Sequence, residues 1–443
     1  MSNSIYLHLG CGEKKFSGFV NIDLEAAGAD LHLDLTQPLP WGQGMVSGIY
    51  SEHFFEHLTQ AQGIRLLLEC RRVLKPGGVV RIAMPDLKSV IDDYINDYVH
   101  PDWAHFGMPW TANRCERFNM SMRWWGHQWL YDEEELIRIG KMVGLEPIGR
   151  CKYGVSADPM FNNLEYRESS RLIVEFYKPE RQLKSGDTPL VSIVIPAYNP
   201  RYFQVALESA LSQTYGNLEI LVTDDCKSDG IKEIISRYSS DERIRYMRNP
   251  DAGKDTGRYN HKLCFSEAKG EFIKFLNDDA LAPHCVERML TSFLNYSDII
   301  LVTSKRQIID QNGNFLPDCI ATVAPVANDS VIDGLAIGAA LLKTRINFIG
   351  EPSTIMFRKS EILDAIPDFM SIDGQEISWI SDVAIHMNLA PKGNIVYLVE
   401  PLSFFRIHDG QIQQTGANIS QIESPKAWGL IQYSWERRGL MKN

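Results

Sequence analysis

Three clusters of acidic and amide residues in the second half of the chain each follow a short apolar run. They are Asn199 after 191–195, Asp224-Asp225 after 218–223, and Asn277-Asp278-Asp279 after 271–276. Adjacent carboxylates at the end of a buried strand repel each other unless a cation offsets them, and a divalent ion bound by oxygen also holds diphosphate oxygens. A single acidic pair is explained more simply as a turn or a helix cap. Three clusters in succession favour a metal-diphosphate site.

A second set of residues suited to ligand binding lies near the N-terminus. Gly10 and Gly12 follow an apolar run at 5–9, and Asp23 follows a second run at 19–22. Glycine lets the backbone approach a ligand closely, and an acidic residue at the end of the next strand can accept both hydroxyls of a ribose. The alternative is a glycine turn and a capping aspartate in an inactive Rossmann-like domain.

The elements that must position these residues alternate between short aliphatic runs and helical patterns, which predicts two α/β domains. In the first half, strands are expected at 5–9, 19–22, 46–50, 79–83 and 172–177, and a helix at 61–73 ends before the Lys-Pro-Gly-Gly sequence at 75–78. In the second half, a helix is expected at 202–213. Ligands bind beyond the carboxyl ends of strands in open parallel sheets, where the clusters are placed.

The segment 178–189 divides the two halves. Its sequence, KPERQLKSGDTP, is polar and flanked by proline, so we expect it to contribute little to either core. We predict one domain at 1–180, a linker at 181–189 and a second domain at 190–443. Two domains agree with the length of 443 residues, which exceeds what one hydrophobic core usually organises.

The bulk composition limits the classes of function. With 44% hydrophobic and 23% charged residues the chain is an ordinary globular protein, and its net charge of -11 supplies no basic field for nucleic acid. The eight cysteines lack the short spacings of a structural zinc site, so we expect reduced thiols. The sequence shows no basic leader and no apolar run of about 18 residues, so we expect a cytoplasmic protein.

In their order and spacing, the segments VSIVIPAYN, LEILVTDDCKSD and GEFIKFLNDDALAP resemble the inverting family 2 glycosyltransferases of the GT-A fold. The resemblance covers about residues 190 to 410. It implies that the nucleobase is held by the end of the first strand and by the second aspartate pair, joined by an arginine on the helix that follows. In this sequence those residues are Pro196, Ala197, Tyr198, Asn199, Asp225 and Arg258.

The same resemblance implies a metal site at the third cluster. Asp279 corresponds to a metal ligand, and Asp278 to a residue of the ribose site or the metal shell. Asn277 stands where the family more often has an aspartate. The implied cofactors are Mn²⁺ or Mg²⁺ and a nucleotide-diphosphate sugar, with a UDP-sugar favoured.

Two later segments, EISWISDVAIHMNLAPKG and SFFRIHDGQ, resemble the catalytic-base region and the closing segment of this family. Inverting sugar transfer needs a base for the acceptor hydroxyl while a metal stabilises the leaving diphosphate. By the resemblance Asp382 is that base, Glu376 is the second choice, and His408 is a metal ligand. Without the resemblance, Asp382 is a helix cap and His408 a packed or surface histidine.

In the first half, LHLGCGEKKFSGFVNID, DLTQPLPW, YSEHFFEHL and RVLKPGGVVRIAMPDL resemble class I S-adenosylmethionine-dependent methyltransferases. The resemblance covers about residues 4 to 178. It implies a Rossmann-like domain in which Gly10 and Gly12 contact the methionine part of S-adenosylmethionine. Asp23 would bind the ribose and Asp34 the adenine.

The acceptor side of this domain is less defined. By the same resemblance Glu52 and His53 would face the methyl donor and acceptor. An insertion further along holds five of the nine tryptophans, Trp103, Trp110, Trp124, Trp125 and Trp129. His127, in WWGHQWLYD, could deprotonate a hydroxyl before methyl transfer, whereas the simpler explanation of the aromatic residues is the core of a lid.

A methyltransferase joined to a glycosyltransferase makes physical sense when the product of one is the acceptor of the other, because tethering raises the effective concentration. We therefore predict a bifunctional enzyme that builds and O-methylates a surface polysaccharide or glycoconjugate. The alternatives are a non-catalytic, acceptor-binding N-terminal domain, or a nucleotide-sugar-binding scaffold in which both sites are degenerate. A lipid-linked acceptor would bring the protein to the inner face of the cell membrane by peripheral contact. Nothing in the sequence indicates the oligomeric state.

Overall fold

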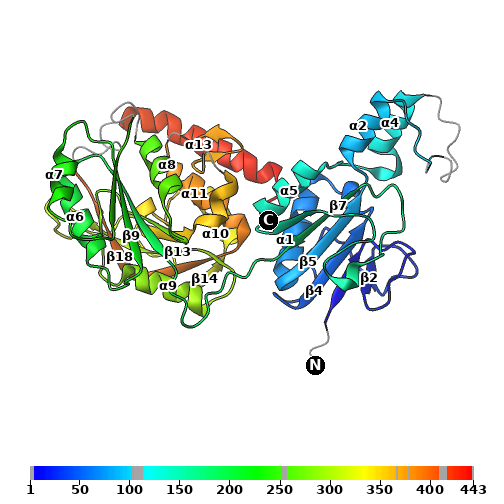
Figure 1. The fold of residues 1–443 in the computed structure, drawn as a ribbon, viewed down its shortest axis with the longest axis horizontal. Coiled ribbons are helices and arrows are strands. Elements are labelled where there is room, and N and C mark those ends of the chain that lie inside the picture. The colour runs from blue at the N-terminus through cyan, green and yellow to red at the C-terminus, as the bar shows by residue number, and fades with distance from the viewer. Residues whose placement is uncertain are drawn as a thin grey trace. The chain divides into compact units, whose positions relative to one another are not determined.

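The chain folds into two compact units, each with its own sheet and helices (Figure 1). The computed structural model describes residues 4–101, 103, 113–250, 257–365, 368–377, 379–408 and 417–441. The first unit comprises residues 1–180 with 437–440, and the second comprises 181–436 with 441–443. Both units combine helices with a sheet, so the predicted α/β class is confirmed. Among the described helices, none has the length and apolar character that crossing a membrane requires.

The N-terminal unit contains a seven-stranded sheet in the order β3-β2-β1-β4-β5-β7-β6. Its strands are β1 (Tyr6–Leu9), β2 (Val20–Asp23), β3 (Leu31–His32), β4 (Val46–Glu52), β5 (Leu74–Met84), β6 (Glu146–Arg150) and β7 (Leu172–Tyr177). Strands β1 to β5 pair in parallel, and β7 is antiparallel to both of its neighbours. The strand order reverses between β1 and β4, and such a switch point is where open α/β sheets bind ligands.

The helices of this unit are α1 (Gln60–Val73), α2 (Leu87–Ile95), α4 (Arg114–Arg123) and α5 (Glu133–Met142). Helix α1 begins at a capping box of Thr59 and Gln62 and ends at Val73, as expected. The chain then enters β5 directly, so the Lys-Pro-Gly-Gly sequence lies within an irregular strand. Helices α1 and α5 pack against the sheet, whereas α2 and α4 pack against each other beyond it (Figure 1).

The C-terminal unit contains a nine-stranded sheet in the order β10-β9-β8-β11-β15-β13-β18-β12, with β14 also paired to β18. The strands are β8 (Val191–Ala197), β9 (Leu218–Asp224), β10 (Ile244–Arg248), β11 (Phe272–Phe275), β12 (Ala280–Leu281), β13 (Ile299–Ile309), β14 (Ser330–Asp333), β15 (Ile355–Arg358) and β18 (Asn394–Arg406), and a separate hairpin joins β16 (Ser371–Ile372) to β17 (Gln375–Glu376). Strands β10, β9, β8 and β11 are mutually parallel. Their carboxyl ends therefore meet at one edge.

Seven helices among the described residues accompany this sheet. They are α6 (Pro200–Leu211), α7 (Gly230–Ser236), α8 (Arg258–Glu267), α9 (Cys285–Asn295), α10 (Gly334–Thr344), α11 (Ser381–Leu389) and α13 (Ala417–Arg437). Six of the seven residues of β8 are buried, because helices cover both faces of the sheet there. Helix α6 starts two residues before the expected helix at 202–213, since Asn199 caps it and Pro200 occupies its first turn.

The segment 181–189 packs on the C-terminal unit. Arg181 is 2% exposed, and its guanidinium binds Asp298 at 2.9 Å and Glu361 at 2.6 Å. Leu183 packs against the core of the same unit. The expectation that this polar segment contributes little to a core is therefore wrong for these two residues. The partners of Arg181 lie more than 100 positions away in sequence, so the local composition could not show them.

Candidate functional site

The three polar clusters of the C-terminal unit lie at the ends of adjacent strands. The parallel register pairs Ala197 at the end of β8 with Asp224 at the end of β9, and Phe275 at the end of β11 pairs with Val194. Residues that follow these strands are thus brought together along one edge, as the sequence indicated. Pro196 and Ala197 are the last two residues of β8, and Asn199 caps α6 through its side chain.

The two aspartates of the second cluster differ in what they contact. Asp224 accepts hydrogen bonds from Tyr246 at 2.7 Å and from Arg248 at 2.6 Å, so its carboxylate stabilises the strand end. Asp225 is buried, and its carboxylate accepts a hydrogen bond from Asn249 at 3.2 Å. Tyr198, which follows β8, is 55% exposed, so its ring is available to stack on a nucleobase. The nucleobase role of Tyr198 and Asp225 stays a prediction.

Arg258 begins α8 behind Gly257, whose φ of 85° is left-handed and favours glycine. Its guanidinium binds Asp368 at 2.6 Å and Glu376 at 2.7 Å, and it also donates to the carbonyl of Met370 at 3.1 Å. Arg258 therefore holds the segment around the β16-β17 hairpin, and its contact with the nucleotide stays a prediction. Glu376, the second choice of base, is the exposed partner of this ion pair.

The third cluster meets the closing segment of the chain. Strand β12 pairs with β18, and His408 lies just beyond β18 with its Nε2 3.7 Å from Asp278 Oδ2. Asp279 is buried and accepts a hydrogen bond from the backbone N–H of Arg406 at 3.0 Å. The structure thus brings together the three residues that the sequence assigned to metal and ribose. Of these, Asp278 and His408 face each other most directly.

The acidic pair is chemically suited to a divalent cation. Burial, together with the adjacent Asp279, raises the pKa of Asp278 to about 7, and burial also raises the pKa of Asp279. Carboxylates whose ionised forms are disfavoured in this way gain most from a nearby cation. Oxygen ligands of this kind fit Mn²⁺ or Mg²⁺, and a histidine nitrogen is acceptable to Mn²⁺. The residues therefore fit the predicted metal.

The candidate base lies in a group of charged side chains that the sequence analysis missed. Asp382, in the first turn of α11, accepts a hydrogen bond from Asn347 at 2.6 Å, and burial raises its pKa. Glu351 pairs with Arg306 at 2.9 Å. Burial raises the pKa of Glu351 to about 7, with further contributions from Asp279 and Asp382. Glu351 is therefore electrostatically coupled to both the acidic cluster and the candidate base.

Asn347 and Glu351 lie within residues 308–351, a region for which the sequence offered no interpretation, and Arg306 lies just before it. The sequence held one local signal, a glutamate that directly follows a glycine, Gly350. In the structure this glycine has a left-handed φ of 108°. A Cβ on Gly350 would lie 2.8 Å from an Arg306 nitrogen, so this glycine lets the arginine approach the backbone. A charged residue between a glycine and a proline thus marked the position.

In the N-terminal unit, the glycine motif and Asp23 form one structure. Gly10 and Gly12 have φ values of 66° and 52°, and a Cβ on Gly10 would lie 2.4 Å from the Phe54 ring. The backbone N–H of Gly12 donates to Asp23 at 2.9 Å. Burial would raise the pKa of Asp23, but backbone N–H groups such as those of Glu25 and Gly12 outweigh it and lower the pKa. Asp23 is thus an ionised acceptor beside an open glycine.

Asp34 occupies a more exposed position after β3. Its carboxylate accepts hydrogen bonds from the backbone N–H of Thr36 at 2.9 Å and from the Thr36 hydroxyl at 2.7 Å. These bonds stabilise a local turn. Contact of Asp34 with an adenine stays a prediction.

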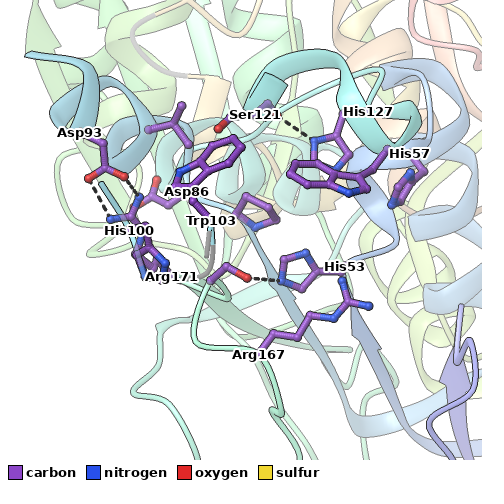
Figure 2. A pocket seen from close by; sticks show the side chains of 14 residues that line it. His53, His57, Asp86, Asp93, His100, Trp103, Ser121, His127, Arg167 and Arg171 are labelled. Carbon is purple, nitrogen blue, oxygen red and sulfur yellow. Dashed lines mark hydrogen bonds and ion pairs between the residues drawn. The ribbon is translucent and has the colours of Figure 1, made fainter. Parts of the chain in front are cut away.

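A cavity of about 360 Å³ opens beyond the ends of β4 and β5 (Figure 2). Its walls include His53, Trp103, Trp125, Arg167 and Arg171. Helices α2 and α4 contribute further lining residues, so the helical pair beyond the sheet forms part of the wall. Two of the five tryptophans of the insertion thus line a cavity, while Trp110 lies outside the described residues.

Glu52 and His53, the two residues expected to face the methyl donor and acceptor, have different surroundings in the structure. Glu52 is buried and accepts a hydrogen bond from the Ser170 hydroxyl at 2.6 Å, so it anchors the loop that carries other lining residues. His53 lines the cavity and lies 3.5 Å from the Ser169 hydroxyl. His127 also lines the cavity, and burial lowers its pKa, which favours the neutral imidazole that a base requires.

Comparison with known proteins finds a family match within each unit. Residues 192–363 match the family described as Glycosyl transferase family 2, and residues 19–82 match the Methyltransferase domain family. An uncharacterized glycosyltransferase of Nostoc sp. (strain PCC 7120 / SAG 25.82 / UTEX 2576) is 26% identical over 246 residues, which are 55% of this chain and 72% of that protein. The chondroitin synthase of Pasteurella multocida (strain Pm70) is 35% identical over 131 residues, which are 29% of this chain and 13% of that protein.

Among solved structures, S. aureus TarS 1–349 in complex with UDP-GlcNAc is similar with a TM-score of 0.44 and 18% identity, covering 55% of this chain and 66% of that chain. The chain therefore spans a small part of the chondroitin synthase and about two thirds of this TarS fragment. The family matches confirm the resemblance seen at the strand ends. Residues 192–363 therefore match the family 2 glycosyltransferases, and residues 19–82 of the preceding unit match a methyltransferase domain.

Proposed function

We propose that the C-terminal domain transfers a sugar, with inversion, from a UDP-sugar to a hydroxyl of a glycan or glycoconjugate. The N-terminal domain would O-methylate the same glycan during synthesis of a surface polysaccharide. The observation that carries the proposal is that His408 Nε2 lies 3.7 Å from Asp278 Oδ2, while Glu351 is influenced electrostatically by both Asp279 and Asp382. Tethering the two activities would favour sequential action on one acceptor.

In the proposed reaction, Asp382 takes the proton of the acceptor hydroxyl. The acceptor oxygen then bonds to C1 of the donor sugar as the bond from C1 to the diphosphate oxygen breaks. A divalent ion held by Asp278, Asp279 and His408 would offset the charge of the departing diphosphate. Asn347 orients the carboxylate of Asp382 through its 2.6 Å hydrogen bond, and Arg306 favours the ionised form that a base needs.

The activity can be tested by measuring UDP release from a panel of UDP-sugars with candidate oligosaccharide acceptors. We expect release that requires Mn²⁺ or Mg²⁺, increases with the correct acceptor and stops when the metal is chelated. Release at the background rate with every donor, despite tight UDP binding, would instead support a nucleotide-sugar-binding scaffold.

Replacing a carboxylate of the acidic cluster should weaken metal-dependent nucleotide binding. We expect Asp279→Asn and Asp278→Asn each to raise the Kd of UDP measured with Mn²⁺ by at least about 10-fold, because metal sites are sensitive to losses of this kind. Calorimetric titration with and without Mn²⁺ measures the effect. Glu242→Gln, an exposed change in the same domain, is the matched control. Equal UDP affinity in all four proteins would exclude the proposed metal site.

Replacing Asp23 should weaken the binding of S-adenosylmethionine and leave the binding of UDP unchanged. Asp23→Asn retains an acceptor for the N–H of Gly12 but loses the charge that would bind the ribose hydroxyls. Because hydrogen bonds to charged groups contribute about 1.5–3 kcal/mol, we expect S-adenosylmethionine to bind roughly 10- to 100-fold more weakly, with UDP binding unchanged. The exposed Glu25→Gln is the control. If the unsubstituted chain binds no S-adenosylmethionine, the N-terminal domain has a structural or acceptor-holding role.

A further inference from the structure

Histidine and glutamate side chains gather at one end of the N-terminal cavity. Glu56 and His57 belong to the short helix η1 (Phe55–His57) after β4, and His127 follows the turn η2 (Trp124–Gly126). In the part of the chain that the structure describes, one group of three possible metal-binding residues has its ligand atoms within 4.8 Å of one another, and it consists of these residues. Figure 2 shows His57 and His127 at the same end of the cavity, which both line.

Glu56 is the unusual member of this group. It is fully buried, its Oε1 lies 3.1 Å from Nδ1 of His53, and its Oε2 accepts no hydrogen bond from the described residues. Its backbone carbonyl accepts N–H groups from Gln128 at 2.7 Å and Trp129 at 3.2 Å, which fixes the turn beside His127. Burying an ionised carboxylate with so few hydrogen bonds is costly, and a bound cation would lower that cost.

The contacts of His127 decide which of its ring nitrogens faces Glu56. Nδ1 lies 2.8 Å from the carbonyl oxygen of Ser121, and a carbonyl can only accept a hydrogen bond. Nδ1 therefore carries the proton, and in the neutral ring Nε2 carries a lone pair. Nε2 lies 4.0 Å from Glu56 Oε1, so a lone pair and a carboxylate face each other. A histidine held by a backbone carbonyl in this way is the usual arrangement of a metal ligand.

We propose that Glu56, His57 and His127 bind a divalent transition-metal ion of the zinc class. Two imidazoles and one carboxylate are a ligand set typical of catalytic zinc, which keeps its fourth position for water or substrate. Because His57 and His127 line the cavity whereas the Glu56 side chain is fully buried, that fourth position faces the cavity. The ligand it would take is a hydroxyl group, whose pKa a bound metal lowers.

This site changes the role assigned to His127, from a base to a ligand. The link to methyl transfer rests on the proposed function, whereas the metal site itself does not depend on it. The competing explanation is that His53 alone satisfies Glu56, since its Nδ1 lies 3.1 Å from Glu56 Oε1. A metal-binding measurement distinguishes the two explanations. If His53 alone satisfies Glu56, we expect no saturable metal binding that depends on His57 and His127.

The test uses the full-length chain carrying Asp278→Asn and Asp279→Asn, so that the proposed metal site of the other domain does not contribute. After removal of metal with a chelator, Co²⁺ is titrated while its visible absorption is recorded, and Zn²⁺ is then added as competitor. We expect one equivalent of four-coordinate Co²⁺ that Zn²⁺ displaces. His57→Gln and His127→Gln should each weaken binding by at least about 10-fold. His32→Gln, at an exposed histidine of the same unit, should have no effect.

S-adenosylmethionine binding, measured on the same samples, keeps the outcomes apart. Saturable Co²⁺ binding that requires His57 and His127 supports the site, whether or not the cofactor binds. No saturable Co²⁺ binding in a chain that still binds S-adenosylmethionine overturns the metal site and leaves methyl transfer intact. Binding that persists in both histidine variants also overturns it. Should those variants fail to fold, a rise in the Tm of the parent chain on adding Zn²⁺ replaces them, and an unchanged Tm counts against the site.

Discussion

Asp382→Asn is expected to lower kcat for sugar transfer by about 10²- to 10⁴-fold, the usual contribution of a general base. The substitution keeps the shape of the side chain and the contact with Asn347, but an amide cannot take a proton from the acceptor hydroxyl. Nucleotide binding should be unchanged, because Asp382 does not belong to the strand ends expected to hold the nucleotide. Initial rates of transfer and calorimetric UDP binding, measured on one preparation, give both quantities.

Glu376→Gln is the matched control for this prediction. Glu376 was the other carboxylate considered as the base, and the structure shows it exposed and paired with Arg258 at 2.7 Å. We expect it to retain most of the activity. If Glu376→Gln loses transfer while Asp382→Asn keeps it, the base has been misassigned. If both variants are fully active, neither carboxylate is the base.

The electrostatic setting of Asp382 explains why it is favoured over Glu376. Burial raises the pKa of Asp382, and a base with a raised pKa binds the acceptor proton more strongly. The charge of Arg306 opposes this effect and favours the ionised carboxylate. Glu351 pairs with the same arginine, so the positive charge is shared between two acidic side chains.

Much of the C-terminal site follows from sequence patterns with local causes. Apolar runs that end in Asp224-Asp225 or Asn277-Asp278-Asp279 had to be buried strands with polar ends, and parallel pairing then placed those ends together. The position of His408 depended on pairing of β12 with β18, over more than 120 residues of chain. Only the family resemblance connected these segments in advance.

The residues that the sequence did not reveal owe their setting to contacts between distant segments. Glu351 and Arg306 meet because of the turn at Gly350, and a lone glutamate or arginine gives no sign of such a partner. Glu56 and His57 were visible within YSEHFFEHL, but His127 lies about 70 positions later. The group of Glu56, His57 and His127 becomes apparent only in the structure, where His127, which follows η2, lies beside the short helix η1.

Arg181→Ala is expected to reduce the free energy of unfolding of the C-terminal unit by about 3–5 kcal/mol, the cost of leaving a buried charge without its partner. The guanidinium of Arg181 contacts the carboxylates of both Asp298 and Glu361, and all three side chains are buried. Removing the guanidinium leaves the carboxylates of Asp298 and Glu361 buried without the positive charge of Arg181. Chemical denaturation followed by the fluorescence of this unit measures the loss.

Lys184→Ala, an exposed change in the same segment, is the matched control and should alter stability little. The pH dependence distinguishes lost charge pairing from lost packing. Burial alone would raise the pKa of Glu361, but Arg181 outweighs burial and holds the pKa below its ordinary value of 4.5. The stabilisation is therefore complete above pH 4.5 and is lost as the pH falls through the lowered pKa. The difference in the free energy of unfolding between the unsubstituted chain and Arg181→Ala should therefore shrink in that acidic range. A difference that does not change with pH would show that lost packing, and not the lost ion pair, accounts for the effect.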